Sequence, residues 1–122
     1  MDLSELLKQP ASIEQLKPLH ALSRTKQPAK STLRILHRLD DILSSFKKDD
    51  NFPVFDPLLF YDYLVKHSRS TGTFIQLRAL LCLHHLVLSY GLSFPKFITV
   101  LYSALTPTLL SSKLVVLFYH RL

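Results

Sequence analysis

The sequence predicts an all-α protein built as an irregular HEAT-like or armadillo-like stack of about six to seven helices. Three observations predict this fold class. The 122 residues include only two glycines, so the tight turns of β-hairpins, which favour glycine, are scarce. Apolar residues make up 48% of the chain, and leucines recur at three- and four-residue spacing. Short polar loops separate the helical segments, as in stacked helix pairs.

Length and composition indicate one domain over residues 1–122, with basic helices in 1–50 and a second helical part in 56–122. A chain of this length can bury roughly two thirds of the surface that it exposes when unfolded. Its single cysteine, Cys82, excludes an internal disulfide framework. The net charge of +6 permits an acidic partner, either a nucleic acid or a protein.

The first helices are expected to be short. Residues 2–8 have leucines on one side and form one or two turns. Ser12 and Gln15 have the spacing of a capping box for the next helix. Pro18 makes that helix short, kinked or restarted, and residues 24–30 form a loop.

The clearest amphipathic helix comes after this loop, with Ser31 or Thr32 as its N-cap. Its apolar face is expected to consist of Leu33, Leu36, Leu39, Ile42, Leu43 and Phe46. Residues 49–51 break the helix, and residues 52–55 form an extended connection.

Two further helices are predicted from start and stop signals. Asp56 offers an N-cap oxygen and Pro57 suits the first helical position, so a helix should begin there and run to His67. Its inward residues are expected to be Leu59, Phe60, Tyr63 and Leu64. Thr73 should cap a long helix over 74–90, and Gly91 should come directly after its end. Because that helix is apolar on every side, we expect it at the centre.

The stretch from Leu92 to Lys113 should form a helix that begins near Pro95 and ends at Thr106-Pro107. One apolar stripe is expected on it, formed by Phe97, Ile98, Leu101, Tyr102 and Leu105. Residues 112–122 include a continuous apolar run that fits a helix or a strand by pattern alone, and the helical context favours a helix.

The same stretch resembles a known family. The ordered residues that carry the resemblance are Phe94-Pro95-Lys96-Phe97, Leu101-Tyr102, Leu105, Pro107, Leu109-Leu110 and Lys113. In this order they resemble the signature block of the CCAAT-binding-factor family of nucleolar complex proteins, and the likeness extends over residues 72–122. Where the family typically has a basic and aromatic run after the leucine pair, this chain departs from it with Lys113-Leu114-Val115-Val116.

The resemblance implies a scaffold in the nucleus and nucleolus that takes part in assembly and processing of the small ribosomal subunit precursor. The implied partners are another small-subunit assembly factor and pre-ribosomal RNA. Residues 56–122 would be the family-like helical core, expected to be incomplete at its C-terminal end. The candidate partner-binding residues are Phe94, Phe97, Tyr102, Leu110 and Lys113. The alternative interpretation is that the aromatic residues belong to the core.

A second candidate site is the run of positive charges between Glu14 and Asp40. Its candidate phosphate-contacting residues are Arg24, Lys26, Lys30, Arg34 and Arg38. Arg34 and Arg38 are one helical turn apart and share a face. The alternatives are a small RNA- or DNA-binding module, a solvated face without a ligand, or a protein-interaction adaptor outside ribosome assembly.

Catalytic and metal chemistry is not expected. His84 and His85 are adjacent and would point about 100° apart on a helix, so they cannot ligate one metal together. The pairs Asp40-Asp41 and Asp49-Asp50 resemble helix-end or loop charges, and no glycine-rich phosphate loop is present. We therefore predict no enzyme activity, cofactor, metal or small-molecule substrate. Polar residues interrupt the apolar run of residues 74–92, so no membrane span is expected.

Overall fold

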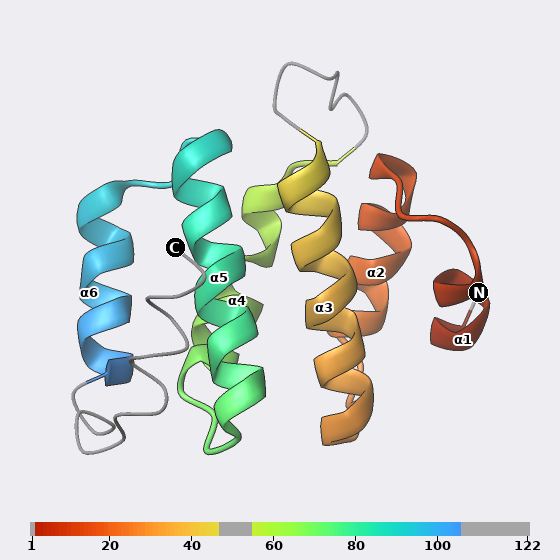
Figure 1. Ribbon diagram of the computed structural model, residues 1–122, viewed down its shortest axis with the longest axis horizontal. Coiled ribbons are helices and arrows are strands. Elements are labelled where there is room, and N and C mark those ends of the chain that lie inside the picture. The colour runs from red at the N-terminus through yellow and green to blue at the C-terminus, as the bar shows by residue number, and fades with distance from the viewer. Residues whose placement is uncertain (1, 47–54, 106–122) are drawn as a thin grey trace.

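The computed structural model describes residues 2–46 and 55–105, and all regular structure in these ranges is helical (Figure 1). Six α-helices and two 3₁₀ turns succeed one another in the described ranges. Their bounds are α1 Leu3–Lys8, η1 Ile13–Gln15, α2 Leu16–Ser23, α3 Ala29–Ser45, η3 Pro57–Phe60, α4 Tyr61–Ser68, α5 Thr73–Ser89 and α6 Phe94–Leu105. The prediction of an all-α stack is confirmed.

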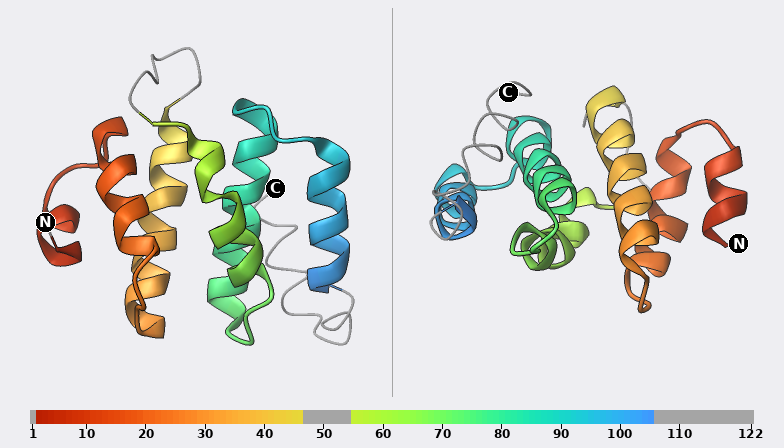
Figure 2. Two further views of the ribbon diagram at one scale, coloured as in Figure 1. Left: turned by 180° about the vertical axis from the view of Figure 1, so that it is seen from behind. Right: turned by 60° about the horizontal axis from the view of Figure 1, so that its bottom comes forward.

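The helices form two antiparallel pairs, α2 with α3 and α4 with α5, that stack side by side. Helices α3 and α5 run in the same direction in one layer, and α2 and α4 lie behind them (Figures 1 and 2). Helix α1 lies at one end of the stack, against α2 and α3, and α6 lies at the other end, against α4 and α5. This arrangement is the HEAT-like pattern that the sequence predicts.

One hydrophobic core runs through the stack. The inward face of α3 agrees with the prediction at Leu36, Leu39, Ile42 and Leu43, all of them buried. Helix α5 contacts α3, α4 and α6, which confirms its central position. Its buried side chains occupy nearly every position between Gln76 and Leu86, as expected of a helix covered from several sides.

Two of the predicted turn and cap residues have the predicted roles. The Asp56 carboxylate accepts a hydrogen bond of 3.0 Å from the Leu58 backbone N–H, with Pro57 in the first helical position. Gly91 comes after the end of α5 with a φ of 81°, a left-handed conformation that suits glycine. The chain turns there, and the Leu92 N–H donates to the Leu86 carbonyl at 3.1 Å.

Three other predicted caps are wrong, although α1 and α6 begin where the sequence predicts. Helix α3 begins at Ala29 with Pro28 as its N-cap, ahead of the predicted cap, because proline has no backbone N–H that would need an acceptor at the start of a helix. Helix α5 begins at Thr73 with Gly72 as its N-cap. The Ser12 side chain makes no capping hydrogen bond. Gln15 instead turns inward and donates to the Leu6 carbonyl at 3.0 Å, so the predicted capping box does not form.

The prediction for Leu59 is also wrong. The sequence predicts that this side chain points inward, whereas it is 58% exposed. The segment around it begins as the 3₁₀ turn η3, which has three residues per turn and therefore rotates Leu59 away from the buried side. Phe60 and Leu64 are fully buried as predicted. The expected helix over 112–122, the stop at Thr106-Pro107 and residues 52–54 of the expected extended connection lie outside the described residues.

Candidate functional site

Helix α6 has two apolar faces rather than the single stripe that the sequence predicts. Its inner face packs on the stack through Phe97, Val100 and Ala104, whose exposed fractions are 3%, 7% and 2%. Its outer face carries Phe94, Ile98 and Tyr102, which are 61%, 40% and 72% exposed. These three residues are spaced four apart, so they line up along one side of the helix. We call them the α6 outer face.

The α6 outer face concentrates the exposed apolar side chains of the described residues. Six large hydrophobic residues are exposed in this part of the chain, and three of them lie on this one helix of 12 residues. Single exposed hydrophobic residues are ordinary, whereas an aligned set is typical of a binding surface. Phe94 and Tyr102 are therefore accessible at the surface, and their binding of a partner stays a prediction.

Phe97, one of the predicted partner-binding residues, does not lie at the surface. It is buried, and its ring lies against His84 with the ring centroids 5.8 Å apart. A side chain in this position stabilises the attachment of α6 to the stack and cannot act as a surface anchor. Leu110 and Lys113, the other predicted partner-binding residues, lie outside the described residues.

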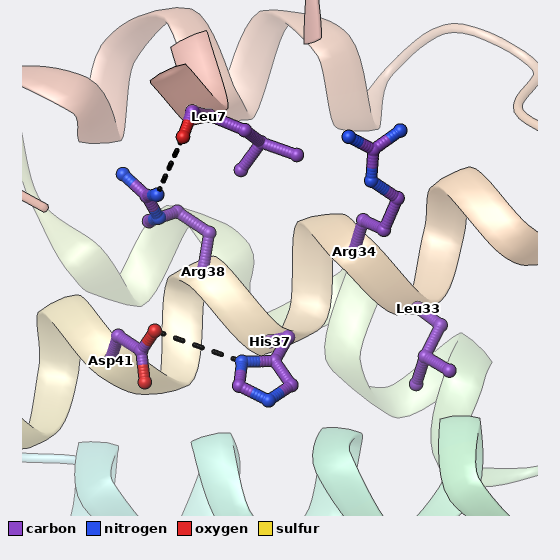
Figure 3. Close-up of a pocket in the computed structure, with 6 residues that line it drawn as sticks. All are labelled: Leu7, Leu33, Arg34, His37, Arg38 and Asp41. Carbon is purple, nitrogen blue, oxygen red and sulfur yellow. Dashed lines mark hydrogen bonds and ion pairs between the residues drawn. The ribbon is translucent and has the colours of Figure 1, made fainter. Parts of the chain in front are cut away.

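A groove between α1 and α3 contains part of the predicted basic site (Figure 3). It has a volume of about 340 Å³ and is lined by Leu7, Leu33, Arg34, His37, Arg38 and Asp41. Arg34 and Arg38 do share a face of α3, as predicted, and Figure 3 shows both projecting from α3 on the side where Leu7 lies. His37 pairs with Asp41 on the same helix, at 3.7 Å between Nδ1 and Oδ2.

The guanidinium of Arg38 is already used within the protein. It donates to the carbonyl of Gln9 at 2.8 Å, to that of Leu7 at 3.2 Å and to Oε1 of Gln15 at 2.8 Å. Arg38 thereby holds the segment after α1 against α3, and three of its five N–H donors are already used. The exposed cations of the predicted patch are Arg24, Lys26, Lys30 and Arg34, and their contact with phosphate stays a prediction.

A buried polar network, which is not among the sites predicted from the sequence, joins α3 to α5. Asp40, 4% exposed, accepts a hydrogen bond from Nη1 of Arg78 through Oδ2, while Nε2 of His85 lies 2.8 Å from Oδ1. Burial alone would raise the pKa of Asp40, but the hydrogen bonds and charges of His85 and Arg78 outweigh it and hold the pKa below its usual value. Asp40 is therefore a structural ion-pair partner, and its predicted role as a helix-end charge is wrong.

One sequence signal could have revealed this network. Arg78 and His85 are seven residues apart, which is two helical turns, so they interrupt the apolar surface of α5 on the same side. Asp40 likewise interrupts the leucine pattern of α3. One acidic residue interrupts the apolar face of α3, and two aligned basic residues interrupt that of α5. This pattern indicates that the two helices face each other.

Cys82 is fully buried in the same interface. Its thiol lies 3.6 Å from the carbonyl oxygen of Leu36, to which it donates a weak hydrogen bond, and burial raises the pKa of the thiol well above its usual value. Such a thiol is inert as a nucleophile. Among residues 2–46 and 55–105, no group of three or more His, Cys, Asp or Glu side chains could hold a metal ion.

Comparisons of the sequence with protein-family models and with curated proteins, and of the structure with solved structures, found no match. No helix among the described residues is both long enough and apolar enough to span a bilayer.

Proposed function

We propose that this protein is a non-catalytic helical scaffold that binds another protein through the α6 outer face. The proposed setting is the nucleolus, where the partner would be a second factor that assembles and processes the small ribosomal subunit precursor. The observation that carries the binding role is the aligned exposure of Phe94, Ile98 and Tyr102 on the last helix of the described stack. The ribosomal setting rests on the resemblance of the block that begins at Phe94.

A helix of the partner is the occupant that fits this face best. Stacked helical proteins bury the apolar side of each helix against the next one, so a further helix packed on α6 would continue the same arrangement. Side chains at four-residue spacing interdigitate with a second helix. The aromatic rings at Phe94 and Tyr102 supply the large contact areas that dominate many protein interfaces.

The test is to purify the tagged protein from its native cell and to identify what is recovered with it. We expect small-subunit precursor RNA and assembly factors, with the proteins retained after nuclease treatment. The variants Phe94→Glu and Ile98→Glu should lower recovery of the partner by about tenfold or more, because a carboxylate would be buried in the interface.

Leu59→Glu is the matched control, since Leu59 is also an exposed hydrophobic residue but lies on η3. It should leave recovery unchanged. Two results would contradict the proposal. One is full recovery of assembly factors by folded α6 variants. The other is a fall in thermal stability of the Glu variants without any change in recovered proteins, which would mean that residues 106–122 of the same chain cover this face.

A second candidate function is RNA binding through the exposed cations. Arg24, Lys26, Lys30 and Arg34 are exposed, and none of them takes part in the salt bridges of the described residues. Binding through phosphate contacts should weaken steeply with salt, and neutralising two of these side chains should reduce the salt dependence. Recovery of varied RNA that is lost in Lys30→Gln/Arg34→Gln, with assembly factors absent, would favour this candidate over the scaffold.

A further inference from the structure

The contact between α5 and α6 contains one histidine in otherwise apolar surroundings. His84 of α5 is half-buried, and its ring lies against the Phe97 ring of α6 with 5.8 Å between the ring centroids. The planes of the two rings are inclined by 41°. Phe97 is buried on the inner face of α6, together with Val100 and Ala104. His84 is therefore a titratable group placed directly against the side chain that attaches α6 to the stack.

The rest of α5 offers His84 no negative charge. The residues one turn before and after it, which share its side of the helix, are Leu80, Leu81, Val87 and Leu88. Helix α5 contains no acidic residue. The adjacent His85 has its ring centroid 6.4 Å away, and its Nε2 lies 2.8 Å from Oδ1 of Asp40. The α3 carboxylate in this region is thus already paired with His85 and Arg78.

The two other helices on this side of α5 supply no counter-charge either. Helix α6 has no acidic residue, and its one charged side chain, Lys96, has its Nζ 4.8 Å from the centre of the Tyr61 ring on α4. The phenol of α6, Tyr102, lies on the outer face. The other titratable groups of α4 line depressions that they share with α2, namely Asp62, Tyr63, Lys66 and His67. Among the described residues, His84 takes part in none of the ion pairs.

A protonated His84 would therefore place a positive charge in an apolar contact without a carboxylate to pair with it. Burial, and to a smaller extent the charge of His85, hold the pKa of His84 below its usual value of 6.5. Because the pKa rises toward 6.5 when the ring becomes exposed, the detached state of α6 binds more protons than the attached state. The attachment is strongest above the usual pKa and weakens as the pH falls through it.

We propose that His84 makes the attachment of α6 to α5 dependent on pH, so that protonation of its ring loosens α6 while the rest of the stack stays assembled. This property needs only the chain itself. Its consequence for binding rests on the proposed function: a partner on the α6 outer face would be held less tightly in mild acid, because the helix that carries the face is no longer fixed.

The experiment is hydrogen exchange of the full chain at about pH 7.5 and about pH 5.5, a range that spans the titration of a histidine and leaves Asp40 ionised. Exchange rates are converted to protection factors, which removes the pH dependence of the chemical exchange step. We expect the protection of α6 amides, relative to that of α5 amides, to fall by about threefold or more on acidification.

Two variants assign the effect to the imidazole. His84→Phe keeps a ring against Phe97 that cannot be protonated, and His84→Gln is a second neutral side chain in case a phenyl ring alters the packing. Both should give the same relative protection of α6 at the two pH values. His67→Gln is the matched control, since His67 is another histidine whose pKa burial lowers, but it lies against Tyr63 at the end of α4. It should retain the pH dependence of the wild type.

A proton NMR titration of the imidazole tests the cause separately. The His84 signals, identified by their loss in His84→Gln, should titrate with a pKa below 6.5. Attraction of the imidazolium to the face of the Phe97 ring would act in the opposite direction and raise this pKa. The measured value therefore decides which of the two effects is larger.

Three results would overturn the proposal. The first is relative protection of α6 that does not change between the two pH values. The second is the same fall in both His84 variants as in the wild type. The third is a His84 pKa at or above 6.5. None of these measurements involves a partner, so they stand apart from the recovery experiment that tests the proposed function.

Discussion

The first and last helices of the described stack differ in how much polar bonds contribute to their attachment. Helix α1 has six residues and is held by polar bonds: Arg38 donates to the carbonyls of Leu7 and Gln9, and Gln15 donates to the Leu6 carbonyl. Helix α6 has twelve residues and is attached mainly by apolar packing of Phe97 and its neighbours.

The difference in attachment follows from the lengths of the two helices. The short helix α1 buries only Leu3 and Leu6, so directional hydrogen bonds add to this packing and fix α1 in one geometry. Three turns bury enough on one side to leave apolar side chains on the other. The α1 end is therefore fixed by directional hydrogen bonds in addition to packing, whereas α6 keeps Phe94, Ile98 and Tyr102 exposed on its outer face.

Between the two ends of the stack, the Asp40 network is a buried polar contact that joins α3 to α5. Asp40→Ala should give the largest effect, a loss of about 3–5 kcal/mol in the free energy of unfolding, because Arg78 and His85 would lose their buried counter-charge. The measurement is urea denaturation. Asp41→Ala, a change at the exposed neighbour, should cost about 0.5 kcal/mol or less. Equal losses for the two variants would show that Asp40 carries no special role.

Phe97→Ala should come next and tests the apolar attachment of α6. We expect a loss of about 3 kcal/mol, at the lower end for a buried phenylalanine because a helix at the end of a stack can relax around the cavity. Ile98→Ala, one residue further along the same helix but on the exposed face, should change stability by about 0.5 kcal/mol or less. If the two variants ranked in the reverse order, the assignment of inner and outer faces would be wrong.

Arg38→Ala tests the polar attachment of α1. The change leaves two backbone carbonyls and a side-chain oxygen without their charged donor, so we expect a loss of about 2 kcal/mol. Hydrogen exchange should show the protection of α1 amides falling further than that of α5 amides. Arg34→Ala serves as the control, and a similar loss of protection in α1 for both variants would count against the Arg38 hydrogen bonds.

The smallest expected effect is a dependence on pH. Because the folded pKa of Asp40 lies below its unfolded value, the stabilisation is complete above about pH 5 and is lost as the pH falls below about 4. The stability difference between the wild type and Asp40→Asn should therefore narrow on acidification, as measured by denaturation at several pH values. A difference that is constant from pH 7 to pH 3 would contradict the depressed pKa.

Local chemistry made part of this structure predictable. Leucine spacing identified the helices and therefore the fold, and residue type alone identified the cap at Asp56 and the left-handed Gly91. The predictions are wrong where a side chain bonds to a residue outside its own helix, which the local sequence does not reveal. Gln15 could have capped its own helix, but it bonds to Leu6 and Arg38 instead.

In the candidate sites too, local sequence predicts some features, and others depend on contacts between distant parts of the chain. Periodicity found that Phe94 to Leu105 is amphipathic, but only the position of α4 and α5 determines that Phe97 faces inward and Ile98 outward. Asp40 and Arg78 are 38 residues apart in the sequence, so no local pattern connects them.

The buried position of Cys82 has a kinetic consequence. It is the single cysteine of the chain, and it lies in the interface that the Asp40 network joins. A thiol reagent can reach it only when α3 and α5 separate, so the rate of labelling in the native state measures how often this interface opens. A destabilisation of about 3–5 kcal/mol at Asp40 would speed that labelling by roughly a hundredfold to several thousandfold. The protein thus carries its own probe of transient opening, at the junction of its two helix pairs.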